Sequence, residues 1–186
     1  MKKTQSLILT SGGLDSTACI AHYLGNGSEV ECLFIEYGQA SLREERSAIT
    51  RISEFYGLNI QIVPISALPR WKTGEIPGRN ALLITLALMT FRWQSGLISI
   101  GIHSGTNYAD CSSEFMTSMQ AVADTYYSGR VQIDAPFLNW TKAEVFHFAK
   151  LSNCPVEMTY SCEAGGVSPC RKCESCLDRE VLYASA

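Results

Sequence analysis

The sequence predicts a doubly wound α/β domain built on a parallel sheet of five strands. Short apolar runs alternate along the chain with longer segments that carry apolar residues at helical spacing. No internal repeat or low-complexity stretch interrupts this alternation. Strands that alternate with helices form a parallel sheet covered on both faces. With 186 residues, the chain is long enough for a single domain over 1–186 with a substantial core.

Five elements are predicted in the first third of the chain. Residues 6–10 form a short apolar strand, and a helix follows over about residues 15–23. Residues 30–36, VECLFIE, are rich in the residues that a buried strand favours. Residues 42–56 mix charges with isoleucines at helical spacing, and the glycine that follows is a C-terminal stop. Residues 59–65 form the third strand.

The alternation continues after a loop with proline and glycine at residues 69–78. Residues 80–94 are mostly apolar and predict a largely buried helix, which leads into a fourth strand at 97–102. Residues 112–126 predict a helix, and residues 131–135 a fifth strand. The apolar residues expected on one face of the helix at 112–126 are Phe115, Met119 and Val122.

The last predicted elements begin at a capping box. Thr141 is the expected N-cap of a helix and Glu144 the residue that reaches back to it. The segment after this helix is irregular and rich in cysteine, and a short helix is expected after Cys176.

Composition narrows the classes of function. The chain is 46% hydrophobic and 18% charged, which is ordinary for a globular protein. Its net charge of −3 argues against a mainly electrostatic grip on nucleic acid. The apolar run 7–9 is too short for the core of a signal peptide, and the run 81–89 is too short to cross a bilayer. We therefore expect a cytoplasmic protein with no membrane contact.

The cysteines predict a metal site. Four of the eight lie within the last 25 residues, and no export signal precedes them. These four residues, the cysteine cluster, are Cys162, Cys170, Cys173 and Cys176. Four thiolates complete a tetrahedral zinc site with no open position, so zinc would be structural. An iron–sulfur cluster is the main competitor, since it also takes four thiolates, and ordinary reduced cysteines are the remaining alternative.

The stretch TSGGLDST at residues 10–17, the glycine loop, lies between the first strand and the first helix. Free N–H groups and the helix dipole make this turn an expected anion site. The loop lacks the lysine and second glycine of a Walker loop, and its spacing does not fit G-x-G-x-x-G. It predicts a phosphate site of another kind, and the alternative is a tight turn capped by Asp15 or Ser16.

The glycine loop resembles the PP-loop, the S-G-G-x-D-S signature of ATP pyrophosphatases with the adenine nucleotide alpha hydrolase-like fold. The resemblance implies that ATP, with Mg²⁺, is split here into AMP and pyrophosphate while a substrate is activated as an adenylate. The residues that it assigns to ATP are Thr10, Ser11, Gly12, Gly13, Leu14, Asp15, Ser16 and Thr17.

Further motifs resemble those of the 7-cyano-7-deazaguanine synthases (QueC-like proteins) along nearly the whole chain. They are YGQ at 37–39, PGRN at 77–80, DCSSEF at 110–115, AP at 135–136 with TKAE at 141–144, and TYSC at 159–162 ahead of the cysteine cluster, with Arg179 after it. The cysteine cluster would lie in an integral zinc-binding subregion at 160–180.

This resemblance implies a specific reaction. Such enzymes adenylate 7-carboxy-7-deazaguanine with ATP and join it to ammonia, and a second ATP converts the amide into the nitrile. The catalytic residues would be Asp15, Arg79 and Lys142, with Asp15 capping the helix or holding Mg²⁺. The implied substrate-binding residues are Arg79, Asn80, Tyr108, Asp110, Glu114 and Phe115. The partners would be small molecules and a second copy of the chain in a homodimer.

The chain departs from the family pattern at several places, one of them Arg171, which stands where glycine is common between the second and third cysteines. Two others bear on the expected substrate site. Ala40 and Ser41 stand where the family usually has a histidine, and His103 occupies the region of an aspartate in the altered segment 103–111. These departures leave open a divergent ligase that stops at the amide or transfers the activated deazaguanine to another amine, including one on a protein. A PP-loop enzyme that modifies tRNA and a zinc-stabilised binding module without catalysis are further alternatives.

Overall fold

A computed structural model describes residues 3–66, 76–103, 105 and 108–184 of the chain. Its centre is a parallel sheet with the strand order β3-β2-β1-β4-β5. The strands are β1 (Gln5–Leu9), β2 (Glu29–Glu36), β3 (Ile60–Pro64), β4 (Gly96–Ile100) and β5 (Val131–Asp134). The predicted five-stranded parallel sheet is confirmed, and each strand end lies within two residues of the expected one.

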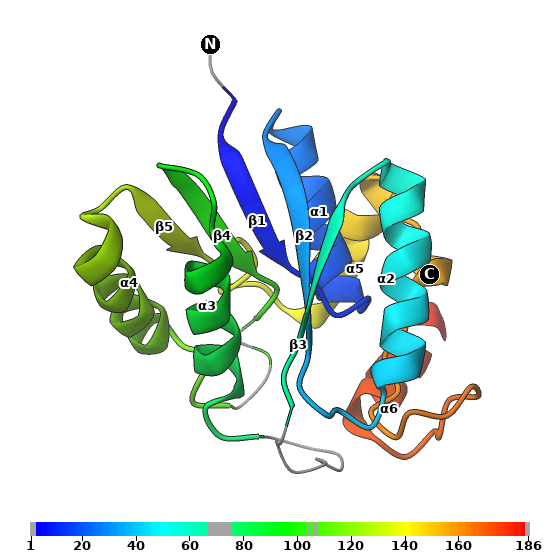
Figure 1. Cartoon of the computed structure of the whole chain (residues 1–186). Helices are drawn as coiled ribbons and strands as arrows, with labels where there is room; N and C mark the ends of the chain where they lie inside the picture. The colour runs from blue at the N-terminus through cyan, green and yellow to red at the C-terminus, as the bar shows by residue number, and fades with distance from the viewer. Residues whose placement is uncertain (1–2, 67–75, 104, 106–107, 185–186) are drawn as a thin grey trace.

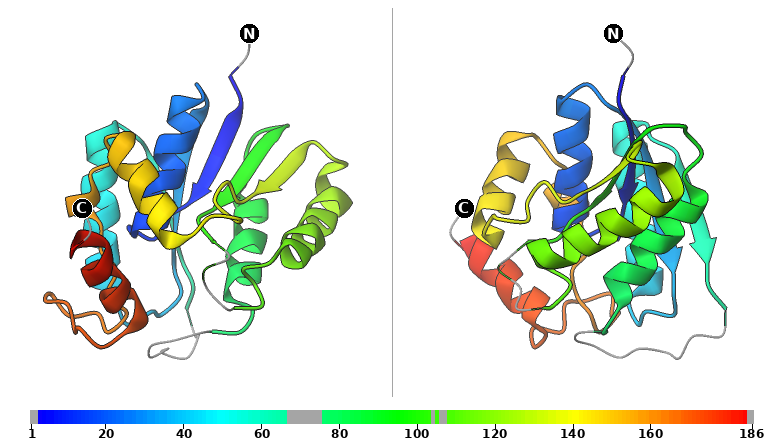
Figure 2. Two further views of the ribbon diagram at one scale, coloured as in Figure 1. Left: turned by 180° about the vertical axis from the view of Figure 1, so that it is seen from behind. Right: turned by 90° about the vertical axis from the view of Figure 1, so that its left-hand side faces the viewer.

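Helices cover both faces of the sheet (Figures 1 and 2). They are α1 (Leu14–Gly25), α2 (Leu42–Tyr56), α3 (Arg79–Thr90), α4 (Ser113–Tyr127), α5 (Lys142–Leu151) and α6 (Glu174–Ala184), with a 3₁₀ turn, η1, at Val156–Met158. Helices α1, α2 and α5 pack on one face, and α3 and α4 pack on the other. The doubly wound class predicted from the sequence is therefore confirmed.

Strand β2 is almost continuously apolar because it is buried on both of its faces. Cys32 and Phe34 point into the core beneath α1 and α2, whereas Leu33 and Ile35 point into the core beneath α3. All four side chains are at most 3% exposed. A strand that is buried on both faces has no solvent side on which polar residues can alternate.

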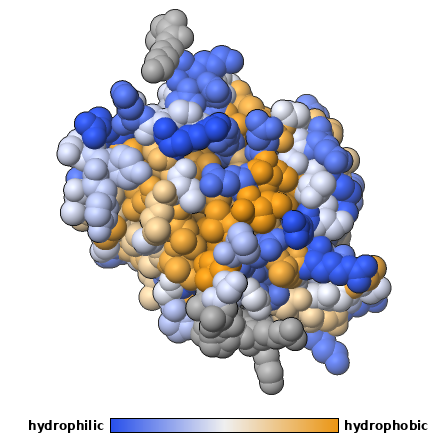
Figure 3. Space-filling view, viewed as in Figure 1, coloured by the Kyte–Doolittle hydropathy of each residue, from blue (hydrophilic) through white to orange (hydrophobic). Residues whose placement is uncertain are grey.

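Helix α3 differs from its prediction. It ends at Thr90 rather than at residue 94, and it is not largely buried, because Leu82 is 37% and Met89 78% exposed. One side of α3 packs on the sheet while the other faces outward, and apolar side chains gather over this face of the molecule (Figure 3). Helix α3 is therefore partly exposed, although its residues are mostly apolar on every side.

The inner face of α4 also differs in part from its prediction. Met119 is buried as expected, and Ala123 is fully buried beside it. Val122 is 38% exposed. The buried stripe advances by four residues from Met119 to Ala123, which turns Val122 away from the sheet.

The glycine loop joins β1 to α1 beside the point where the strand order reverses, between β1 and β4. Gly12 has a φ of +75°, and a Cβ there would lie 2.8 Å from the Cβ of Ala48 and 2.9 Å from the carbonyl oxygen of Glu45. A Cβ on Gly101, after β4, would lie 2.8 Å from the backbone of Asp15. Glycine at both positions lets the loop, α2 and the end of β4 meet in close contact.

The predicted capping box at the start of α5 is confirmed. The backbone N–H of Glu144 donates to the Thr141 hydroxyl at 3.3 Å, and the N–H of Thr141 donates to the Glu144 carboxylate at 2.7 Å. This fixes the first turn of α5, which carries Lys142, at the same edge of the sheet as the glycine loop.

Two further expectations concern the loop at 69–78 and contact with a membrane. Residues 69–75 of the predicted loop lie outside the described residues. In the part of the chain that is described, no helix combines the length and the apolar character that crossing a membrane requires.

Candidate active site

A pocket of about 320 Å³ opens at the carboxyl ends of β1, β2 and β4. Ligands of open α/β sheets bind at this edge, where the strand order reverses. Its walls come from the glycine loop, from the first turns of α2, α3 and α5, and from the irregular tail that carries the cysteine cluster. Segments that are far apart in the sequence therefore meet around one cavity.

The glycine loop is held in shape by its own hydroxyl groups. The N–H of Ser11 donates to the Ser16 hydroxyl at 3.2 Å, and the N–H of Gly13 donates to the Ser11 hydroxyl at 3.3 Å. The Ser16 hydroxyl donates in turn to the carbonyl oxygen of Gly13 at 3.2 Å. These bonds hold the loop in shape ahead of α1, whose first residues line the pocket. The free N–H groups of a first helical turn are the donors that a phosphate site requires.

Most of the loop residues assigned to ATP line the pocket. They are Thr10, Ser11, Gly13, Leu14, Asp15 and Ser16. Thr17 lies behind them, 1% exposed, and its hydroxyl donates to the carbonyl oxygen of Gly13 at 2.8 Å. Gly12 lies behind as well, against α2. These two residues shape the loop from within.

Asp15 does not cap α1, because the N-cap is Gly13. Its carboxylate forms an ion pair through Oδ2 with the ammonium of Lys142 from α5. The other oxygen, Oδ1, is buried and has no hydrogen-bond partner within the described chain. Carboxylate oxygens are the ligands that Mg²⁺ prefers in proteins. The free oxygen therefore fits a magnesium ion at the loop, while Oδ2 holds Lys142 beside it.

Arg79 and Asn80 begin α3 and both line the pocket. The backbone N–H of Asn80 donates to the Asp110 carboxylate at 3.3 Å, and its amide nitrogen donates to the carbonyl oxygen of Asp110 at 3.3 Å. Asp110 thus fixes the first turn of α3 from behind. Arg79 also interacts with the side chain of Tyr37, which follows β2.

The other residues assigned to the substrate lie away from this pocket. Tyr108, Asp110, Glu114 and Phe115 are not among the described side chains that line it. Phe115 packs against the core beneath α4, and Glu114 is exposed in the first turn of that helix. The structure does not bring these residues to the glycine loop, and a role for them in substrate binding stays a prediction.

His103, at the start of the altered segment 103–111, is a buried polar side chain close to the glycine loop. His103 is 7% exposed, and its Nδ1 accepts a hydrogen bond from the N–H of Gly105 at 3.1 Å. Burial lowers the pKa of His103, and the charge of Asp15 opposes that shift. A histidine whose Nδ1 accepts a bond carries its proton on Nε2 and is neutral.

Sequence reasoning missed a group of pocket residues after β2. Gln39 and Ser41 line the pocket, as does Glu45 in the first turn of α2. The sequence does hold a signal: Glu45 precedes Ile49 and Ile52 by four and seven residues, so it shares the helix face that packs on the sheet. A carboxylate on an inward face is unusual unless it has partners.

Burial raises the pKa of Glu45 above its usual range. Hydrogen bonds from Ser41 and Gln39 and the charge of Arg79 oppose this shift. The pKa of the Tyr37 phenol, in the same part of the pocket, is also raised by burial. This end of the pocket therefore combines a desolvated carboxylate with a cation and an aromatic ring.

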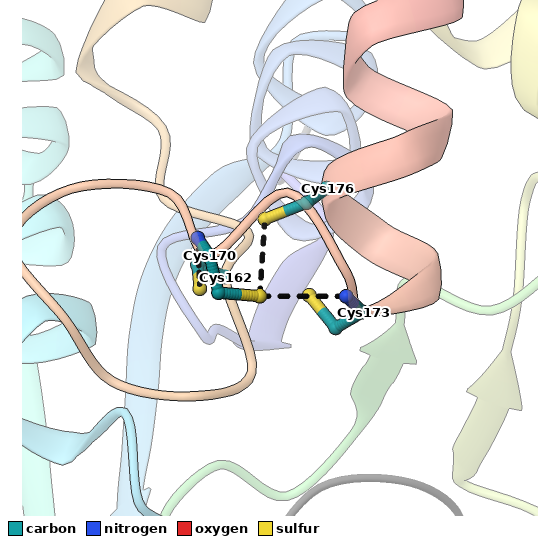
Figure 4. Close-up of side chains that lie close together, drawn as sticks. All are labelled: Cys162, Cys170, Cys173 and Cys176. Atoms are coloured by element: carbon teal, nitrogen blue, oxygen red, sulfur yellow. Dashed lines mark hydrogen bonds between the residues drawn. The ribbon is translucent and has the colours of Figure 1, made fainter.

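The cysteine cluster is assembled at the start of α6 (Figure 4). One ligand atom from each of Cys162, Cys170, Cys173 and Cys176 lies within 4.8 Å of all the others. The N–H of Cys173 donates to Sγ of Cys170 at 3.4 Å, and the pKa of Cys170 is lowered by N–H groups, that of Cys173 most. Sulfur atoms around a tetrahedral zinc ion lie about 3.8 Å apart, given Zn–S bonds of about 2.3 Å. The cluster fits a metal ion.

The cysteine cluster is joined to the pocket wall. The N–H of Tyr160 donates to the carbonyl oxygen of Gly12 at 2.9 Å. The Arg179 guanidinium donates to the carbonyl oxygen and the hydroxyl of Thr159, each at 3.1 Å. Arg179 also lines the pocket, with Tyr160 and Glu163. The order of the cluster and the shape of the pocket therefore depend on the same stretch of chain.

Comparison with known proteins finds a family match over nearly the whole chain. The family model described as "Queuosine biosynthesis protein QueC" matches residues 5–75 and 69–186. A 7-cyano-7-deazaguanine synthase of Acetivibrio thermocellus is 30% identical over 201 residues, which cover 94% of this chain and 90% of that protein. The 7-cyano-7-deazaguanine synthase 1 of Desulfitobacterium hafniense is 31% identical, with 97% of this chain and 91% of that protein covered.

Solved structures share the fold at lower identity. The U34-tRNA thiolase NcsA from Methanococcus maripaludis, with its [4Fe-4S] cluster, has a TM-score of 0.56 at 16% identity over 99% of this chain and 66% of that chain. A 4-thiouridine synthetase in complex with RNA and bound ATP has a TM-score of 0.55 at 19% identity over 97% of this chain and 50% of that chain. At this identity the likeness shows the fold alone.

Proposed function

The chain belongs to the QueC family, and on that premise we propose that it is an ATP-dependent carbon–nitrogen ligase that forms AMP and pyrophosphate. Its substrate would be 7-carboxy-7-deazaguanine, which it joins to ammonia and converts through the amide into 7-cyano-7-deazaguanine. The observation that carries this proposal is the convergence of the glycine loop, Lys142 and Arg79 on one pocket from three separate elements.

In the first step, a carboxylate oxygen of the substrate attacks the α-phosphorus of ATP, and pyrophosphate leaves. The free N–H groups at the start of α1, beside the pocket, would stabilise the negative charge that accumulates on the leaving group. Lys142 adds a cation that its ion pair with Asp15 holds in place. Asp15 Oδ1 would ligate Mg²⁺, which shields the phosphate charges.

In the second step, ammonia attacks the acyl carbon of the adenylate, and AMP leaves with one oxygen of the original carboxylate. Negative charge passes onto the remaining oxygen as the tetrahedral intermediate forms. Arg79, fixed at the first turn of α3, would stabilise that oxygen. A second ATP would activate the amide oxygen in the same way, and loss of AMP with that oxygen leaves the nitrile.

We further propose that the cysteine cluster holds a structural zinc ion. Four sulfur atoms within 4.8 Å of one another suit a single tetrahedral ion. A [4Fe-4S] cluster binds each thiolate through a different iron, which requires a wider spread of sulfur atoms. With four thiolates bound, the ion has no open position for a substrate, so its contribution would be to hold residues 159–179 against the pocket.

A homodimer is proposed as the state in solution, as the family resemblance implies. The surface of α3 supports it, because residues 80–90 carry no charge and Met89 is 78% exposed. Apolar side chains also gather over α3 in Figure 3. Sedimentation at micromolar concentration should give twice the chain mass, and Met89→Glu should shift the protein towards the monomer.

A second candidate function is a ligase that transfers the activated deazaguanine to an amine other than ammonia. The altered segment 103–111 supports it, because it places the neutral imidazole of His103 where the family has an aspartate. Such an enzyme would form AMP with the acid but would not incorporate ammonia.

The proposal is tested by incubating the protein with ATP, Mg²⁺ and 7-carboxy-7-deazaguanine, with and without ammonia, and identifying the products by mass spectrometry. The expected result is AMP, pyrophosphate and the nitrile, with the amide as an intermediate. An adenylate that accumulates although ammonia is present would favour the second candidate, whereas an accumulating amide would mean that the reaction stops before the nitrile. No AMP in the presence of this acid would contradict both.

A further inference from the structure

Glu45 is anchored at the end of the pocket between β2 and α2. The Ser41 hydroxyl donates to Oε1 of Glu45 at 2.5 Å, and the Gln39 amide nitrogen donates to Oε2 at 3.0 Å. The Gln39 side chain is itself fixed, because its oxygen accepts from the N–H of Tyr37 at 2.9 Å and its nitrogen donates to the carbonyl oxygen of Ile35 at 3.2 Å. The carboxylate is therefore held in one orientation.

The carboxylate keeps unused acceptor capacity. A carboxylate group has about four acceptor positions, two on each oxygen. Ser41 occupies one position on Oε1, and Gln39 occupies one on Oε2. Among the contacts of the described residues, one further acceptor position is left on each oxygen of this side chain, which lines the pocket. Two neighbouring N–H donors of a ligand can bind to such a pair.

Arg79 lies near Glu45 but not against it. Its charge acts on the Glu45 carboxyl group, yet within the described chain the two form no direct ion pair. Both side chains line the same cavity, together with the ring of Tyr37. A flat ligand group that offers donors on one side and an acceptor beside them can contact the anion and the cation together.

We propose that Glu45 recognises the 2-aminopyrimidin-4-one edge of a guanine-like heterocycle. Its two oxygens accept from the ring N–H and the exocyclic amino group, which are adjacent on that edge. The ring carbonyl oxygen comes next and contacts Arg79. A carboxyl group on the five-membered ring lies on the same side as this carbonyl oxygen, so the reacting group is directed towards Arg79 and the glycine loop.

The alternative occupant of this end is the adenine of ATP. Adenine presents one amino donor, and the neighbouring ring nitrogen is an acceptor. That nitrogen would face a carboxylate oxygen, which is repulsive because neither atom carries a proton. The donor pair of a guanine-like edge matches the carboxylate without such a conflict, so the observations favour the heterocyclic substrate over ATP.

This inference rests on the proposed function, and it is tested by comparing two acids. The first is 7-carboxy-7-deazaguanine, and the second is the same acid without its 2-amino group. Calorimetric titration in the presence of an ATP analogue that cannot be cleaved between the α and β phosphates gives both affinities. The wild-type protein should bind the amino compound about 10- to 100-fold more tightly, as expected for a hydrogen bond to a charged group.

Glu45→Gln should reduce this preference to less than about threefold, since its amide presents a donor to the ligand's amino group. The matched control is Glu44→Gln, one residue away, because Glu44 pairs with Arg43 and does not line the pocket. It should keep the full preference. Circular dichroism and thermal unfolding confirm that each variant is folded.

Four results would overturn the assignment. Equal affinity of the wild-type protein for the two acids would do so without any variant. An unchanged preference in a folded Glu45→Gln would do so while leaving the proposed function intact. Loss of affinity for the ATP analogue alone in Glu45→Gln would assign Glu45 to adenine instead. If the wild-type protein binds neither acid and forms no AMP with them, the proposed function fails together with this inference.

Discussion

The two ends of the pocket are built in different ways. The end at the glycine loop comes mostly from one stretch of eight residues, 10–17, to which α5 adds only Lys142. The rest of the pocket is assembled from side chains after β2, in α2 and α3, and in the cysteine-rich tail. The first kind of site can be recognised as a local motif, whereas the second exists only after the chain has folded. The predictions that follow separate the contributions of the two ends.

The largest expected effect is at Gly12, where the loop meets α2. Gly12→Ala places a Cβ 2.8 Å from the Cβ of Ala48 and 2.9 Å from a backbone oxygen, so the loop has to move. We expect kcat/KM for AMP formation to fall by at least about 100-fold, because small displacements of catalytic groups have effects of that size.

The matched control for this change is Gly27→Ala. Gly27 has the same φ of +75°, but a Cβ there meets nothing within 4 Å. Both variants carry the backbone strain of a left-handed alanine, and only Gly12→Ala adds the clash with α2. Equal activity in the two variants would show that the fit of the loop against α2 is unimportant.

The next effect is at Lys142. Lys142→Met removes the cation that pairs with Asp15, and kcat for AMP formation should fall by about 100-fold, as when one preorganised group that stabilises charge is lost. Lys150→Met changes an exposed lysine at the other end of α5 and should leave the rate within about twofold. Steady-state kinetics with saturating acid measures both. A rate in Lys142→Met close to that of wild type would remove Lys142 from the phosphate end.

The third prediction concerns the cysteine cluster. Cys173→Ser should release the metal and lower the Tm by about 10 °C, because several kcal/mol of folding free energy depend on a structural zinc site. Ser168 is exposed in the same loop, and Ser168→Ala should change neither the metal content nor the Tm. Elemental analysis should find one zinc ion per chain in the wild-type protein. Iron with inorganic sulfide would contradict the zinc assignment.

The smallest effect is a pH dependence of stability that arises from Glu45. Its pKa is raised by burial above the ordinary 4.5, so the folded protein holds this proton more tightly than the unfolded chain does. Stability therefore falls as the pH rises from about 4.5 through the raised pKa, and then levels off. Urea denaturation between these limits should show this decrease in the wild-type protein and not in Glu45→Gln. Parallel curves for the two proteins would mean that the carboxyl group is not desolvated.

Features that depend on neighbouring residues were easier to predict from the sequence than features that are assembled only in the folded chain. The five strands, the capping box at Thr141 and the glycine loop were predicted because each depends on a few neighbouring residues. The cysteine cluster was predicted from spacing alone, and its ligand atoms do meet. That residues 1–186 form one domain stays a prediction.

The other end of the pocket was predicted less well, for physical reasons. Phe115 and Glu114 have the residue types of a ligand site, but the rotation of α4 turns one into the core and the other into solvent. Glu45 was missed because a glutamate in the first turn of an amphipathic helix usually faces water. Its spacing to Ile49 and Ile52 is the sequence signal for the inner face, and the residue type argues against that signal.

The measurement that tests the account most directly is the exchange of radiolabelled pyrophosphate into ATP. It reports only the reversible formation of an adenylate and needs no amine. The account predicts rapid exchange when 7-carboxy-7-deazaguanine is present and none without it, with loss of exchange in Lys142→Met. Absence of exchange with this acid, from a folded protein with its cysteine cluster metallated, would contradict the central claim.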